Sequence, residues 1–273
     1  MNATESKLQE IKQYGYPLDF GEVFGQAFEN YKKIALIVGC IILVLIIAFT
    51  VLVGGFAGIL FGIGSITTFF TNYSLQSNST VLLVVNLVAS VVGAALIAPL
   101  TAGLLKIAHL AEGNKEFSFS TAFDFYKSSF FKDLFVSTMI ITLFSSVLTT
   151  LLSLIELHFP DSGFNWIIKL FTIFIGILTP LFTLLTIPLI IFGNIAAVDA
   201  IKGSILLVRK NFWIILFLII VGAIFSIIGI FGFCLGIFFT LPFMYSLEYI
   251  IYRNAINFEE ETEIDDIGNS FLN

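Results

Sequence analysis

The sequence predicts an all-α integral membrane protein, with six transmembrane helices in three hairpins, each preceded by an amphipathic interfacial helix. Three observations predict this class. First, 58% of the residues are hydrophobic and only 12% are charged, whereas about 25% charged residues is usual for a soluble domain. Second, apolar runs long enough to cross a bilayer recur along the chain. Third, the lysines and arginines gather in the loops of one side.

The segment from Phe20 to Phe56 sets the pattern for the rest of the chain. Between Phe20 and Lys33, apolar residues recur at i, i+3, i+4, i+7 and i+8, which is typical of an amphipathic helix lying in a membrane interface. From Ile34 onward the residues are apolar, glycine or threonine, so this run predicts the first span. The polar residues 1–16 hold no apolar core, so we expect the first span to act as its own insertion signal.

Three copies of one unit are predicted: an amphipathic segment, a span, a short outer turn and a second span that contains proline. The second and third amphipathic segments are expected at Phe119–Phe130 and Val198–Arg209. The predicted spans are Ile34–Gly62, Val81–Ile107, Leu134–Leu157, Trp166–Gly193, Trp213–Ile230 and Leu235–Tyr252. Prolines in the second span of each hairpin are Pro99, Pro188 and Pro242, and Pro180 joins Pro188 in span four.

The distribution of positive charge predicts the orientation. Of the 13 lysines and arginines, all but Lys169 fall on one side of the membrane: before span one, between spans two and three, between spans four and five, or after span six. Lys169 lies just inside span four. Because positive loops stay in the cytoplasm, both termini are predicted to be cytoplasmic.

The chain therefore divides into a cytoplasmic N-terminal segment (residues 1–18), a six-helix membrane domain (19–253) and an acidic cytoplasmic tail (254–273). The tail holds six carboxylates between Glu259 and Asp266. Such a block is typical of a disordered, solvated tail, and it could also dock on a basic partner.

Ionisable groups near the bilayer are the candidate functional residues. Glu156 and Lys169 face each other across a short outer turn, and two interpretations apply: an ion pair at the outer interface, or a gate or ion site. Glu248 lies about one turn before Arg253 at the inner boundary. We expect it to be structural and hydrogen-bonded to a tyrosine or to the first amphipathic segment.

The prolines admit two interpretations. Each proline removes a backbone hydrogen bond and kinks its helix. Kinks at similar depth could frame a shared cavity, as in transporters, or could serve packing alone.

Enzyme signatures are missing from the sequence. It contains no His-Glu-x-x-His, no Gly-x-Ser-x-Gly and no phosphate-binding loop. We therefore expect no cofactor, no metal and no catalytic residue. No basic patch exceeds two adjacent residues, so nucleic-acid binding is not expected.

Five short segments carry a family resemblance: Leu18–Phe28 (LDFGEVFGQAF), Asn30–Lys33 (NYKK), Ser204–Phe212 (SILLVRKNF), Gly236–Pro242 (GIFFTLP) and Tyr252–Arg253 (YR). They resemble a family of bacterial six-helix inner-membrane proteins, which is similar to the membrane domain of some glycerophosphodiester phosphodiesterases. The phosphodiesterase domain itself has no counterpart in these residues. The resemblance thus implies a multi-pass protein of the bacterial inner membrane without known catalytic residues.

The leading functional hypothesis is a non-enzymatic accessory or scaffold subunit, surrounded by membrane lipids, that packs against another membrane protein complex. The alternative is a small-solute or lipid transporter with a cavity under the proline kinks. An intramembrane lipid enzyme that uses Glu248 is a third, more distant hypothesis.

Overall fold

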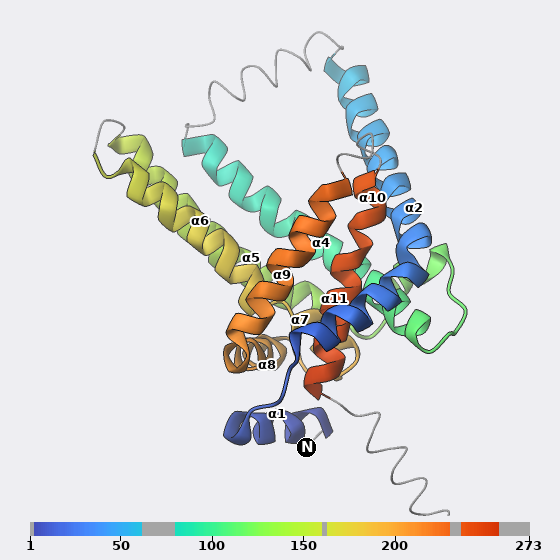
Figure 1. The fold of residues 1–273 in the computed structure, drawn as a ribbon. Coiled ribbons are helices and arrows are strands. Elements are labelled where there is room, and N and C mark those ends of the chain that lie inside the picture. The colour runs from blue at the N-terminus through green and yellow to red at the C-terminus, as the bar shows by residue number, and fades with distance from the viewer. Residues whose placement is uncertain (1–2, 62–79, 160–162, 230–235, 257–273) are drawn as a thin grey trace, which may run out of the picture.

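Every regular element that the computed structural model describes, in residues 3–61, 80–159, 163–229 and 236–256, is a helix (Figure 1). The helices are α1 (Ala3–Tyr14), α2 (Phe20–Phe61), α4 (Thr80–Glu112), the 3₁₀ helix η1 (Phe119–Lys127), α5 (Phe131–His158), α6 (Asn165–Phe182), α7 (Thr186–Ile191), α8 (Ala197–Lys210), α9 (Phe212–Ile228), α10 (Gly236–Thr240) and α11 (Pro242–Ile256). The all-α prediction is confirmed. The acidic tail lies outside the described residues, except that α11 continues to Ile256.

Four helical stretches are long and apolar enough to cross a membrane: Phe20–Leu52, Thr80–Glu112, Phe131–His158 and Asn165–Ile191. The pair α8 and α9 is a fifth candidate, bent by 96° where the two helices meet. The sixth predicted span, Leu235–Tyr252, begins outside the described residues, and its described part is divided between α10 and α11. The described residues therefore show four to five helices that can span a membrane, and the sixth span stays a prediction.

The three predicted amphipathic segments take three different forms. Phe20–Lys33 is the first part of the continuous helix α2, and its residues Val23 and Ala27 are buried inside the bundle. The expectation of a separate helix in the interface is wrong here, because the apolar face packs against α9 and α11. The second segment forms the short η1, and the third forms the separate helix α8.

Aromatic side chains fill the contact between α2, α9 and α11. Phe24, Phe28 and Tyr31 of α2 meet Phe243 of α11 at ring-centroid distances of 5.5, 6.5 and 5.7 Å, mostly edge-on. Phe225 of α9 lies 4.8 Å from the Phe243 ring, and Phe243 is fully buried. Edge-to-face packing of this kind stabilises a core beyond the burial of its area.

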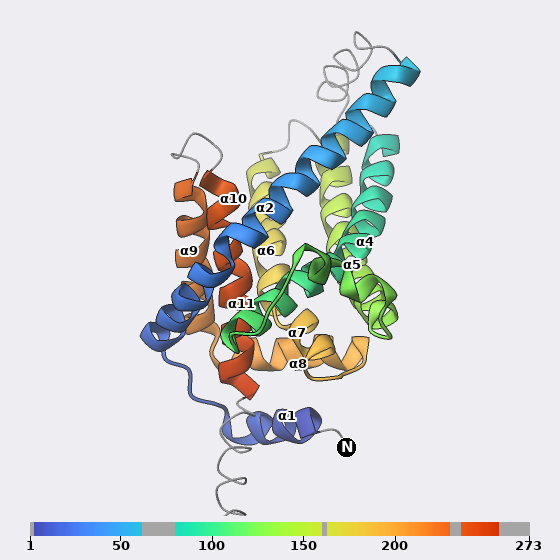
Figure 2. The same ribbon diagram turned by 90° about the vertical axis from the view of Figure 1, so that its right-hand side faces the viewer.

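The helices converge at one end of the bundle and spread apart at the other. The α5–α6 hairpin leans to one side and the outer part of α2 to the other, while α7, α8 and α11 lie close together at the opposite end (Figures 1 and 2). The ends of α1 and α11 lie at this converging end too. Both described ends of the chain are therefore on one side of the bundle.

The N-terminal segment is tied to the bundle rather than separate from it. Leu8 of α1 packs on Gly203 of α8. The Tyr16 hydroxyl donates a hydrogen bond to the carbonyl of Leu207 at 3.1 Å, and the Asn211 amide donates to the carbonyl of Tyr16 at 2.9 Å. Burial raises the pKa of Tyr16 to about 12, against a smaller lowering by Asn211. The hydroxyl thus keeps its proton at neutral pH and remains a donor.

Span four is broken between α6 and α7, and a serine of α8 occupies the break. Pro188 lies in the first turn of α7 and has no N–H group, so the carbonyl of Leu184, four residues earlier in the break, lacks its helical donor. The buried Ser204 hydroxyl donates to the carbonyl of Phe182 at 2.8 Å and accepts from the N–H of Leu185 at 3.0 Å. Irregular backbone at membrane depth needs such partners, so α8 holds the break in place.

We expect Ser204→Ala to lower the free energy of unfolding by about 1–3 kcal/mol, because it strands a buried donor and a buried acceptor. Unfolding by denaturing detergent, followed by circular dichroism, measures the loss. Ser226→Ala is the matched control, since Ser226 is also buried but its hydroxyl, among the described residues, bonds only the carbonyl of Gly222 in its own helix at 2.9 Å. That carbonyl keeps its helical donor, so the control should change stability by less than about 0.5 kcal/mol. Equal losses in the two variants would contradict the role of Ser204.

Candidate functional site

A network of polar side chains joins α2, α4 and α11 at the converging end of the bundle. On α11, Ser246, Tyr249 and Arg253 recur at i, i+3 and i+7, which places them on one face of the helix. This face meets α2 and the last turns of α4. We call the set of Gln26, Asn30, Lys33, His109, Glu112, Ser246, Tyr249 and Arg253 the inner polar network.

Glu112, the last residue of α4, is the centre of this network. Its carboxylate accepts hydrogen bonds from the Arg253 guanidinium and from the Tyr249 hydroxyl. His109 Nδ1 lies 3.0 Å from the same hydroxyl. Because the Tyr249 hydroxyl donates its single proton to Glu112, it can only accept from His109, so His109 Nδ1 is the donor in this second bond. A carboxylate at a helix C-terminus is unfavourable next to the helix dipole, and Arg253 offsets this with its positive charge.

Asn30 connects three helices through one buried amide. Its Nδ2 donates to the carbonyl of Ala108 on α4 at 2.8 Å, and its Oδ1 accepts from the Ser246 hydroxyl on α11 at 2.8 Å. Asn30 is only 4% exposed. Buried amides that are satisfied in this way fix the register of the helices that they join.

The ends of α4 and α11 are held by further bonds from α2. Lys33 Nζ donates to the carbonyl of Ala111 at 3.1 Å and to Asn114 Oδ1 at 2.8 Å, which satisfies the C-terminus of α4. Gln26 Oε1 accepts from Arg253 at 2.6 Å and from Asn254 at 2.8 Å. The inner polar network thus pairs its charges and amides with one another, an arrangement that locks helices together.

The structure places Glu248 on another face of α11 from the inner polar network. Glu248 is half-buried. Within the described residues it makes no hydrogen bond or ion pair, so the expected bond to a tyrosine or to the first amphipathic segment is not formed there. The neighbouring Tyr249 instead carries the bond to a carboxylate, that of Glu112.

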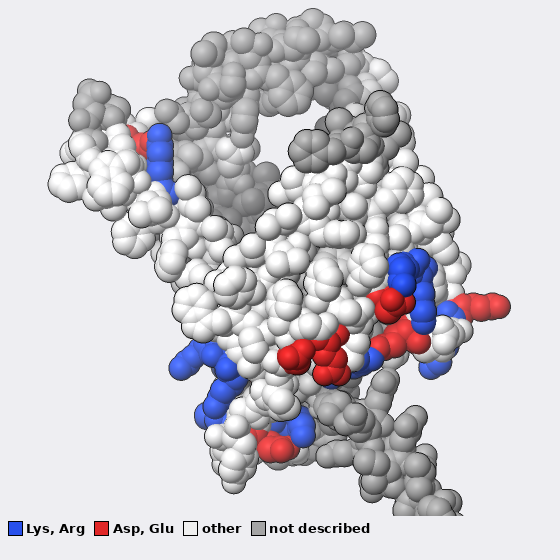
Figure 3. Space-filling model, in the orientation of Figure 1, with Lys and Arg blue, Asp and Glu red and all other residues white. Residues whose placement is uncertain are grey.

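Glu156 and Lys169 form an ion pair, one of the two interpretations drawn from the sequence, with 3.4 Å between Nζ and Oε1. Lys169 is 67% exposed and Glu156 34%, so the pair is open to its surroundings. It joins the tips of α5 and α6, far from the charged side chains that gather at the opposite end of the bundle (Figure 3).

The four prolines occupy unlike positions. Pro99 is buried within α4, which continues through it, and Pro180 lies near the end of α6. Pro188 lies in the short α7, and Pro242 is the first residue of α11, where a missing N–H costs little. A groove of about 540 Å³ between α5, α6 and α8 is lined by Thr179, next to Pro180, and by none of the four prolines. That groove is therefore not a shared cavity framed by the kinks.

Sequence reasoning missed the inner polar network, although one signal for it was present. Gln26, Asn30 and Lys33 recur at i, i+4 and i+7 and form a polar stripe on α2. The other members come from segments far along the chain. In the described residues, no group of three or more His, Cys, Asp or Glu is placed to hold a metal ion.

Comparison of the chain with models of protein families, with curated proteins and with solved structures finds no match. The family resemblance of the sequence motifs stays a prediction, and the function is argued from the structure itself.

Proposed function

We propose that this protein is a non-enzymatic accessory or scaffold subunit of the bacterial inner membrane, which packs against another integral membrane protein. The observation that carries the proposal is the outer half of α2. All seven residues from Ile46 to Leu52 are exposed. Because seven residues make about two helical turns, the described part of the bundle leaves this stretch of the span exposed on every side.

The exposed part of α2 is also rigidly presented. The helix runs without a break from Phe20 to Phe61, a length of about 63 Å at 1.5 Å per residue. Its inner half is fixed by Asn30 and Lys33 in the network with α4 and α11. Membrane helices associate by close packing of preformed surfaces, and an anchored, unaccompanied helix offers such a surface.

The distribution of charge supports the cytoplasmic placement of both termini. The charged side chains on the face drawn in Figure 3 gather at the end of the bundle where α1 and α8 lie. Positive residues stay on the cytoplasmic side. Glu112 and Glu156 are each engaged by a cation, which supports a structural role for these two carboxylates.

We expect the double substitution Phe49→Ala with Leu52→Ala to reduce the co-purified partner at least about tenfold, because two truncated contacts of about 1 kcal/mol each weaken packing by that factor. The experiment is affinity purification from native membranes in polymer discs, with quantitative mass spectrometry of the retained proteins. Phe49 and Leu52 are 68% and 71% exposed, so their truncation should leave folding intact.

The matched control is Phe171→Ala with Phe174→Ala on α6, whose side chains are 56% and 57% exposed. We expect this variant to retain the partner fully. A wild-type protein that purifies with lipid alone would contradict the proposal. Recovery of a second, differently tagged copy of this chain would instead identify α2 as a self-association surface.

A further inference from the structure

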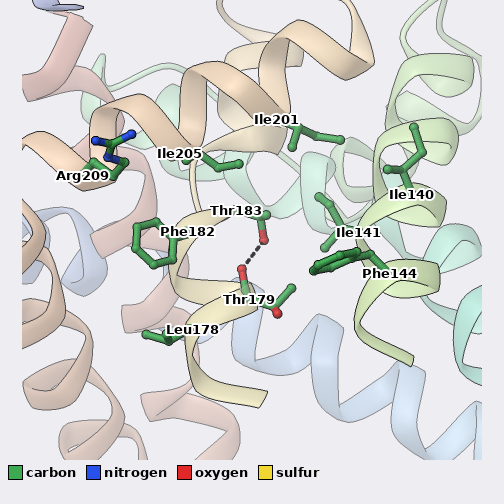
Figure 4. A pocket seen from close by; sticks show the side chains of 10 residues that line it. All are labelled: Ile140, Ile141, Phe144, Leu178, Thr179, Phe182, Thr183, Ile201, Ile205 and Arg209. Carbon is green, nitrogen blue, oxygen red and sulfur yellow. Dashed lines mark hydrogen bonds between the residues drawn. The ribbon is translucent and has the colours of Figure 1, made fainter. Parts of the chain in front are cut away.

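The groove between α5, α6 and α8 lies at the point where span four breaks. Its walls are Ile140, Ile141 and Phe144 of α5 and residues around Thr179 of α6, and α8 closes it on the third side (Figure 4). The space exists because α6 ends at Phe182 and α8 crosses below it, held there by Ser204. Its volume of about 540 Å³ falls within the range of roughly 300–1,000 Å³ that is typical of small-molecule sites.

The lining of the groove is apolar apart from the side chains of Thr179 and Thr183 and of Arg209 at one end. Of the ten lining residues, all of them described, Arg209 alone is charged. The Thr183 hydroxyl is occupied, since it donates to the carbonyl of Thr179 at 2.7 Å. Ile201, Ile205 and Arg209 follow one another at intervals of four residues on α8 and form one stripe, apolar at the start and cationic at the end.

Arg209 is available for an anion. Its side chain is exposed, and it forms no ion pair or hydrogen bond within the described residues. In Figure 4 the guanidinium stands at one end of the groove beside Phe182 and Ile205. A planar guanidinium binds phosphate oxygens through two parallel hydrogen bonds, so this end is complementary to a phosphate.

The position of the groove matches the boundary between lipid tails and headgroups. α8 meets α9 at 96°, so it lies across the bundle while α9 runs along it. Trp213, just after this bend, is 69% exposed, and exposed tryptophan favours the headgroup level. An occupant with an acyl chain along α5 and α6 would therefore have its polar group at Arg209.

We propose that this groove is a binding site for an anionic glycerophospholipid, with one acyl chain against α5 and α6 and the phosphate on Arg209. The apolar lining, the single cation at one end and the place of that end at the membrane boundary together select a lipid over a polar solute. The proposal does not depend on the accessory function, because the purified protein alone can test it.

The test uses delipidated, detergent-purified protein mixed with equal amounts of phosphatidylglycerol and phosphatidylcholine, and native mass spectrometry counts the lipids retained. One arginine near an anionic headgroup contributes an interaction that corresponds to about a fivefold preference, so wild type should retain phosphatidylglycerol by about that ratio. Arg209→Gln should abolish the preference. Lys210→Gln, an exposed neighbour outside the groove lining, should keep it within about twofold.

A second variant tests the apolar part of the site. Ile205→Trp should fill the groove and remove the retained lipid, whereas Ile220→Trp on the exposed face of α9 should not. Equal effects of the two charge variants would overturn the proposal in favour of general surface attraction. Absence of retained phosphatidylglycerol on wild type, or its persistence after Ile205→Trp, would overturn it as well.

Discussion

Replacing Gly103 with alanine should lower the free energy of unfolding by about 3 kcal/mol, the upper part of the usual range for overpacking. A Cβ on Gly103 would overlap the backbone carbonyl group of Ala122 in η1. A flexible side chain could relieve such an overlap by changing its rotamer, but backbone atoms cannot. The helix η1 would therefore have to move away from α4. That movement would strain the 2.9 Å bond from the Tyr126 hydroxyl to the carbonyl of Leu96 and the ion pair between Lys106 and Asp124.

The same helix provides the control. Gly93 also lies within α4, but a Cβ there meets nothing within 4 Å. Gly93→Ala should therefore raise stability by up to about 1 kcal/mol, because alanine loses less backbone entropy in a helix than glycine. Unfolding in denaturing detergent measures both variants, and limited proteolysis at η1 reports its displacement. If Gly103→Ala proved as stable as Gly93→Ala, the close approach of η1 to α4 would be wrong.

The long apolar runs allowed the spanning helices to be predicted from the sequence. The contacts between these helices could not be predicted. The apolar runs of α2, α4 and α5 are each long enough to identify a helix without any tertiary information. The amphipathic period of Phe20–Lys33 identified a helix as well, but a period does not reveal what covers the apolar face. In this chain it is covered by Phe225 and Phe243 rather than by the membrane interface.

The prolines show a similar limit. From a proline in the sequence one can predict the loss of one backbone hydrogen bond. One cannot predict how the surrounding helices compensate for that loss. Pro99 stays inside a continuous helix beside the buried Ala95, Pro242 begins a helix, and Pro188 accompanies a break that Ser204 satisfies from another helix. These outcomes depend on neighbours that are distant in sequence.

The polar sites divide in the same way. Glu156 and Lys169 lie close together along the chain, on either side of one short turn, so the sequence could offer their pairing as one of two interpretations. Glu112 and Arg253 are 141 residues apart, and span two was predicted to end at Ile107, before Glu112 is reached. Because α4 continues to Glu112, the carboxylate is carried to α11 and becomes the centre of the inner polar network.

Arg253→Ala should destabilise the fold by about 3 kcal/mol, the lower end of the range for breaking a buried ion pair. The lower end applies because Arg253 and Glu112 keep 26% and 23% of their side-chain surface exposed. The substitution leaves the Glu112 carboxylate at the end of α4 without its cation and removes the bond to Gln26. Glu112→Ala should cost a similar amount, since it removes the shared acceptor of the Arg253 guanidinium and the Tyr249 hydroxyl.

A double-mutant cycle separates the pair from the general loss of side chains. If Glu112 and Arg253 stabilise the bundle through each other, the double variant should lose about 1.5–3 kcal/mol less than the sum of the single losses. The exposed pair Glu156 and Lys169, taken through the same cycle, should show a coupling of no more than about 1 kcal/mol.

Strict additivity at Glu112 and Arg253 would refute the network as the element that fixes α2, α4 and α11. The proposal that α2 is presented rigidly would then lose its anchor, because Asn30 and Lys33 alone would have to hold the inner half of that helix against α4.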